Sequence, residues 1–137
     1  MTDKDGMKIR AKEKSKLSRA GLKAFFKLAS LWKLSTEQQT ILLGLEPSLN
    51  VNHLQNRVEA GEVVLLTENQ LERLSLIIGI RKGVELLYPK ERVDSVMHEP
   101  NKAFDGRTLI EIMLDGSVQS LYRVRQYLES SQGSHFV

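Results

Sequence analysis

Apolar residues recur at intervals of three and four along nearly the whole chain, and this spacing restricts the fold more than any other feature. The stripes run over 17–32, 51–58, 71–87, 109–113 and 118–128. Such spacing predicts amphipathic helices. Only Glu62–Leu66, with the sequence EVVLL, reads as a possible strand, and one strand cannot make a sheet. We therefore expect an all-α fold.

Helix ends are marked by local signals. Ser35–Gln38 and Thr67–Gln70 both have the form of a capping box, in which a hydroxyl residue is followed three positions later by Gln. Gly44, Gly61, Pro89 and Pro100 mark the ends of helices. A short helix is expected over residues 90–98. Two glycines, at positions 79 and 83, fall inside the stripe over 71–87, where we expect a bend or a close helix contact.

Charge is distributed unevenly. Residues 1–33 carry ten Lys or Arg and three Asp or Glu, whereas residues 34–137 carry ten and fourteen, so the net charges are +7 and −4. Residues 1–16 are polar and basic with little to bury, and we expect a disordered tail there. The tail could contact phosphate groups of nucleic acid, or it could only be solvated.

The composition excludes several kinds of protein. The chain has no Cys, so disulfides and thiolate zinc sites are excluded. No apolar run has the length of about 18 residues that a membrane span needs, and no signal peptide is recognisable. We expect a cytoplasmic protein with no membrane partner, no metal and no cofactor.

Residues 35–60 have the outline of a helix-turn-helix, with a short capped helix, a turn and a second helix. With Val51, Leu54 and Val58 inward, the second helix presents polar residues that could bond base edges. The residues expected to contact DNA are Lys33, Gln38, Asn52, His53, Gln55, Asn56 and Arg57. An ordinary solvated helix face is the alternative.

Recognisable enzyme motifs are absent, since the chain has no GxGxxG, Walker loop, HExxH or GxSxG sequence. Asp94 and His98, four residues apart, could be a fragment of a general base. A surface contact is the more common meaning of such a pair. We expect no catalytic residues.

The segment Asn101–Gly116, NKAFDGRTLIEIMLDG, has two glycine turns on either side of one short apolar helix. Gly106 and Gly116 permit positive φ, so the helix can fold back over Phe104 as a compact platform. The final SSQGSHFV is expected to be a free tail that reaches into a cleft of a partner.

Three stretches together resemble the Xre/MbcA/ParS antitoxin family, whose members are encoded beside RES-domain toxins in bacteria. They are LWKLSTEQQTILLGL, LTENQLERLSLIIGIRKGVELLYP and PNKAFDGRTLIEIMLDGSVQSLYRVRQYL, and the resemblance covers residues 22–128. The last stretch is similar to the family's toxin-binding domain at Pro100, Asn101, Phe104, Gly106, Leu109, Gly116, Val124, Arg125, Tyr127 and Leu128. Two features depart from the family's pattern. Thr108 stands where the family often has Pro, and the turn over residues 45–50 is a few residues longer than usual.

The resemblance implies an Xre-like helix-turn-helix domain at 17–88 and a small helical toxin-binding domain at 89–137. It implies an antitoxin that blocks the active site of an NAD-consuming or ADP-ribosylating toxin, binds operator DNA and represses its own operon, as a homodimer. The residues expected to bind the toxin are Asn101, Phe104, Arg107, Arg123, Arg125, Tyr127, Leu128, His135, Phe136 and Val137. A DNA-binding regulator without a toxin partner is the alternative, and an enzyme comes third.

Overall fold

A computed structural model describes the backbone of residues 2–135, together with the side chains of residue 13 and residues 16–132. The described chain is all-helical. Its elements are α1 (Thr2–Leu31), α2 (Thr36–Leu43), α3 (Val51–Glu59), α4 (Glu68–Leu87), α5 (Leu109–Met113) and α6 (Val118–His135). Two short 3₁₀ helices, η1 (Ser95–His98) and η2 (Lys102–Phe104), precede α5. No strand forms among residues 2–135, which confirms the all-α prediction.

The predicted helix ends are confirmed at atomic detail. Ser35 and Thr67 each make both hydrogen bonds of a capping box, with Gln38 and Gln70. The Asn50 side chain accepts hydrogen bonds from the first backbone N–H groups of α3, which begins directly after it. Because these caps satisfy donors that the first helical turn leaves unpaired, α2, α3 and α4 begin at fixed residues.

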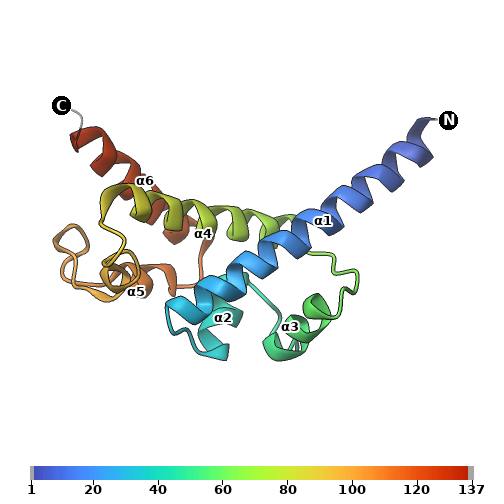
Figure 1. Ribbon diagram of the computed structural model, residues 1–137, viewed down its shortest axis with the longest axis horizontal. Coiled ribbons are helices and arrows are strands. Elements are labelled where there is room, and N and C mark those ends of the chain that lie inside the picture. Colours follow the sequence, from blue (N-terminus) through green and yellow to red (C-terminus); the bar gives the residue numbers. More distant parts are fainter. Residues whose placement is uncertain (1, 136–137) are drawn as a thin grey trace.

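Helix α4 is the centre of the packing, because it contacts α1, α2 and α6 (Figure 1). Helix α3 packs on α1 and α2, and α5 packs on α6 and η1. The N-terminal part of α1 and the C-terminal end of α6 extend away from the body on opposite sides (Figure 1). Helix α3 lies toward the side of the view from which α1 extends, and α5 with its flanking loops lies toward the side from which α6 extends (Figure 1).

One hydrophobic core extends from α1 to α6. Leu22 and Phe25 of α1 and Trp32, directly after α1, are completely or almost completely buried, as are Ile77 of α4 and Leu121 of α6. The core therefore runs across the boundary expected between residues 88 and 89. No helix among the described residues combines the length and the apolar character that crossing a membrane requires.

The close helix contact expected at the glycines of α4 is confirmed. A Cβ atom on Gly79 would lie 2.3 Å from the guanidinium of Arg125, and one on Gly83 would lie 3.2 Å from Cβ of Leu128. Both partners belong to α6, so the absence of side chains at these two positions is what lets α6 approach α4 closely.

Three local expectations differ from the structure. Residues 2–16 form the first half of α1 instead of a disordered tail, and Lys, which favours helices, is the most frequent residue of this segment. The first part of the expected free tail SSQGSHFV continues α6 as far as His135. Residues 90–94 form turns in place of a helix, with only η1 following, because Asp94 is drawn to Arg81 on α4.

Candidate functional site

The C-terminal platform, which we define as residues 100–128, is held together by a cluster around Tyr127. The Asn101 side-chain amide donates a hydrogen bond of 3.1 Å to the Tyr127 hydroxyl. The Phe104 and Tyr127 rings pack edge to face with centroids 5.3 Å apart. The guanidinium of Arg123 lies 5.6 Å from the centre of the Phe104 ring. Four of the residues that we expected to bind a toxin thus form one unit that fastens the 100–107 loop to α6.

The 100–107 loop closes on itself through backbone hydrogen bonds. The N–H of Asn101 donates to the carbonyl of Arg107 (3.1 Å), and the N–H of Gly106 donates to the carbonyl of Asn101 (2.9 Å). Gly106 has φ of +85°, and the preceding Asp105 also has positive φ. This geometry turns the loop outward, so that Lys102 and Arg107 are exposed above buried Phe104.

A second aromatic residue borders the cluster. Burial is the main cause that raises the pKa of the Tyr88 hydroxyl, and the nearby Tyr127 raises it further. Arg92 lies over the Tyr88 ring at 5.4 Å and pairs with Glu99. Sequence analysis did not single out Tyr88 or Arg92, because their relation to Tyr127 arises only when the turns after α4 fold back onto α6.

Two further residues expected at the toxin interface make contacts within the protein. Leu128 is 1% exposed and belongs to the core, so it cannot touch a partner in this conformation. The guanidinium of Arg125 lies against Gly79 and also donates to the Glu129 carboxylate (3.2 Å). Arg125 therefore bridges α6 to α4. The His135 side chain, Phe136 and Val137 lie outside the described residues.

The predicted recognition helix has a polar outer face. Asn52, His53 and Asn56 on α3 are exposed, and Gln55 is half-buried. Arg57 is less available, since it donates 2.9 Å to the Glu62 carboxylate and 3.0 Å to the carbonyl of Val63. These two hydrogen bonds fasten residues 62 and 63, which follow α3, to the Arg57 side chain.

The remaining residues expected at the DNA are not gathered around α3. Gln38 is half-buried, and its side-chain oxygen accepts the Ser35 N–H in the capping box at the start of α2. Lys33 is exposed in the turn before α2, where it lines a depression together with Asp94 and His98. The structure therefore brings together Asn52, His53 and Asn56, and leaves Lys33 apart.

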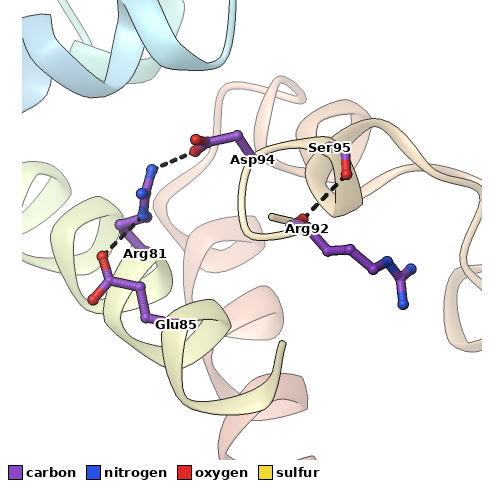
Figure 2. A network of polar contacts seen from close by, with 5 residues as sticks. All are labelled: Arg81, Glu85, Arg92, Asp94 and Ser95. Carbon is purple, nitrogen blue, oxygen red and sulfur yellow. Dashed lines mark hydrogen bonds and ion pairs between the residues drawn. The ribbon is translucent and has the colours of Figure 1, made fainter. Parts of the chain in front are cut away.

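Asp94 does not orient His98. Its carboxylate pairs with Arg81 of α4, which also donates 3.0 Å to Glu85 (Figure 2). Ser95 donates to the backbone carbonyl of Arg92 in the same turn (Figure 2). These contacts fix the turns after α4 to the outer side of α4. No group of three or more metal-ligating side chains occurs within the described part of the chain.

Arg73 is a connecting residue that the sequence did not reveal. Its guanidinium donates 2.8 Å to the carbonyl of Gly116, and its Nη1 lies 3.4 Å from the carbonyl of Ile41 in α2. Nε donates 2.9 Å to the side chain of Asn69. One side chain on α4 thus links the last turn of α2 to the turn that begins α6.

Comparison with known proteins finds a relative that matches over most of the chain. The chain is 39% identical over 115 residues to the uncharacterized protein y4oB of Sinorhizobium fredii, and the match covers 83% of this chain and 85% of y4oB. This chain belongs to the family of y4oB. The match therefore extends over most of both proteins and includes the helix-turn-helix outline and at least part of the C-terminal platform.

A second similarity is partial. The chain is 30% identical over 105 residues to the nuclear pore complex protein NUP93B of Arabidopsis thaliana, and this match spans only 11% of NUP93B. No family model matches the chain. No solved structure matches it either.

Proposed function

We propose that the chain is an antitoxin that binds a RES-domain toxin through the C-terminal platform and blocks the toxin's active site. The observation that supports this most is the cluster of Asn101, Phe104, Tyr127 and Arg123. These residues, three of which fall on the pattern of the Xre/MbcA/ParS toxin-binding domain, meet in one place although up to 26 positions separate them. Such an antitoxin acts in the cytoplasm as a non-enzymatic binding protein.

The platform contains buried residues that support the loop and exposed residues that could contact a partner, as a binding surface requires. Buried Phe104 and half-buried Tyr127 hold the loop in place, while Lys102, Arg107 and Arg123 are exposed. Exposed guanidinium groups donate charge-assisted, often bidentate hydrogen bonds to carboxylates. A rigid loop that already presents such groups loses little conformational entropy when it binds. We expect these cations to meet acidic or carbonyl groups at the mouth of the toxin's cleft.

The test is co-expression with the product of the adjacent gene, with cellular NAD measured and the complex recovered by affinity purification. Wild-type protein should restore growth and NAD. The Lys102→Glu/Arg107→Glu double variant should lose rescue and complex formation. The matched control is Lys82→Glu, which reverses an exposed charge on α4.

Circular dichroism of each variant separates loss of binding from loss of fold. If the adjacent gene product is harmless alone, the proposed antitoxin role is wrong, and if the folded double variant still neutralises it, the proposed platform is wrong.

A second candidate function is operator binding by α3, and the exposed face of Asn52, His53 and Asn56 favours it. Asn side chains can bond adenine in a bidentate way. A gel shift on the DNA upstream of the gene tests this, with Asn56→Ala expected to abolish specific binding. Arg57→Ala is the poorer probe, since it also releases Glu62 and Val63.

The two functions are distinguishable. A chain that acts only as a regulator binds DNA and leaves the adjacent gene product active. An antitoxin that also represses its operon loses DNA binding in Asn56→Ala but still neutralises the toxin.

A further inference from the structure

Helix α1 carries a row of positive residues that belongs neither to the platform nor to α3. Lys or Arg recurs at intervals of three or four along most of the helix. This cation row consists of Lys4, Lys8, Lys12, Lys16, Arg19, Lys23 and Lys27. At about 100° per residue, these positions fall within a sector of about 140° around the helix axis. Asp5 is the one acidic residue of α1 in that sector, so the row keeps most of its charge.

The part of the cation row whose side chains the structure describes is not neutralised by the protein. Lys16, Lys23 and Lys27 are exposed, and none of them makes an ion pair within the described part of the chain. The guanidinium of Arg19 lies so near Gly61 that a Cβ there would be 3.3 Å from it, and the buried Nε of Arg19 has no hydrogen-bond partner among the described residues. Because Gly61 lies two residues beyond α3, the row passes the end of α3 with its charge unpaired.

The row is long, and much of it stands clear of the other helices. The N-terminal part of α1 extends away from the body of the protein (Figure 1). From Lys4 to Lys27 the helix covers about 35 Å, at a rise of about 1.5 Å per residue. This length is about that of one turn of B-DNA, so one face of α1 can meet several phosphates of the same duplex.

The composition of the extension favours a nucleic acid over a membrane surface. A helix that lies on a membrane needs large apolar residues opposite its basic face. Between residues 2 and 16, only Met7 and Ile9 are large and apolar. A duplex requires no apolar face, because cations that neutralise its phosphates release bound counterions and so supply the affinity.

We propose that the cation row of α1 binds the phosphate backbone of duplex DNA, independently of the base sequence. The row is the main basic surface for this purpose, since residues 34–137 carry a net charge of −4. The proposal does not rest on operator recognition by α3, because contacts to phosphates carry no sequence information. A duplex held by the row nevertheless lies near the end of α3, where phosphate contacts would add affinity to any base contacts that α3 makes.

Fluorescence anisotropy tests this with the full chain and a labelled duplex whose sequence is unrelated to the DNA upstream of the gene. The association constant K is measured at several salt concentrations. Each phosphate contact contributes about 0.9 to the slope of log K against log salt, so Lys12→Gln/Lys16→Gln should make the slope shallower by about 2 units. Gln favours helices about as well as Lys, so the substitutions preserve α1.

Arg10→Gln/Lys14→Gln is the matched control. These two positions alternate with positions 12 and 16 in the sequence but lie about 160° away around the helix axis. The control removes the same charge from the same segment and should change the slope by less than about half a unit. Asn56→Ala, which tests base contacts by α3, should leave binding of the unrelated duplex unchanged. Failure of operator recognition and failure of the cation row are therefore seen separately.

Three outcomes overturn the proposal. The first is a wild type that does not bind the unrelated duplex at about 100 µM protein and about 50 mM salt, where even non-specific DNA-binding proteins are bound. The second is an equal change of slope in both double variants, which would mean that only the net charge matters. The third is an unchanged slope in Lys12→Gln/Lys16→Gln. If that variant also fails to bind the adjacent gene product, the row is a contact of that protein instead.

Discussion

The family resemblance assigns Leu128 to the toxin interface, whereas the structure places it in the core. The Leu128→Ala substitution distinguishes these two roles. The side chain is 1% exposed and packs at the point where α6 meets Gly83 of α4. Removing a fully buried leucine costs about 2–5 kcal/mol, depending on how far the surroundings close the cavity. Because α4 carries no side chain at Gly83 that could move into the space, we expect a loss of about 3–4 kcal/mol.

Urea unfolding measures this loss, and the chain supplies its own reporter. Trp32 is the only tryptophan and is completely buried in the same core, so its fluorescence reports unfolding of the whole domain. Leu86→Ala is the matched control, since Leu86 lies on α4 and is 74% exposed, and its effect should stay within about 0.5 kcal/mol.

A binding assay with the adjacent gene product tests whether Leu128 also contacts the partner. Leu128→Ala should bind the adjacent gene product as tightly as wild type under conditions where both are folded. A stability loss below about 1 kcal/mol together with lost binding would refute the core assignment and return Leu128 to the interface.

Three further predictions concern the turns around α5 and α6. Arg73→Ala removes the donor to the Gly116 carbonyl and should cost about 1–2 kcal/mol in urea unfolding, since hydrogen bonds from charged groups are stronger than neutral ones. Gly106→Ala should cost about 1 kcal/mol in the same assay, because φ is +85° there even though a Cβ would meet no other atom within 4 Å. The pKa of Asp115 is lowered to about 2 by the hydrogen bond that the Ser117 N–H donates to its carboxylate. A lowered folded-state pKa gives stability that is present above about pH 4 and is lost as the pH falls toward 2, so the difference between wild type and Asp115→Asn should shrink over that interval.

Much of the fold could be predicted because its signals are local. The capping boxes at Ser35 and Thr67 depend on residues three positions apart, and both formed as expected. The glycines of α4 indicated a close contact, although nothing in the sequence could say that α6 makes it. Residues 90–98 were predicted wrongly as one helix, because the Arg81–Asp94 pair joins residues that are distant in sequence.

The candidate site was harder to predict. Helical spacing alone does not tell whether a residue of the motif packs inside the protein or is exposed to a partner. Tyr127 and Leu128 are neighbours in one motif, yet Tyr127 holds the loop at Asn101 and Leu128 enters the core. Arg125 points at Gly79, whereas Arg123 lies over Phe104 at the surface. Only the direction in which α6 packs on α4 decides between these roles.

The two proposed surfaces meet in α4, and this restricts how one could influence the other. Arg73 connects α4 to both the last turn of α2 and the Gly116 turn, so a shift of α6 relative to α4 would disturb a contact with α2 through this side chain. At the far end of α4, Arg81 holds the turns that lead into the platform. A packed core resists continuous deformation, so a change in how these two arginines pair is one way in which a partner bound to the platform could change α3. If Arg73→Ala leaves toxin binding intact but removes any effect of the toxin on operator affinity, this side chain carries the coupling; an unchanged effect would place it elsewhere in the shared core.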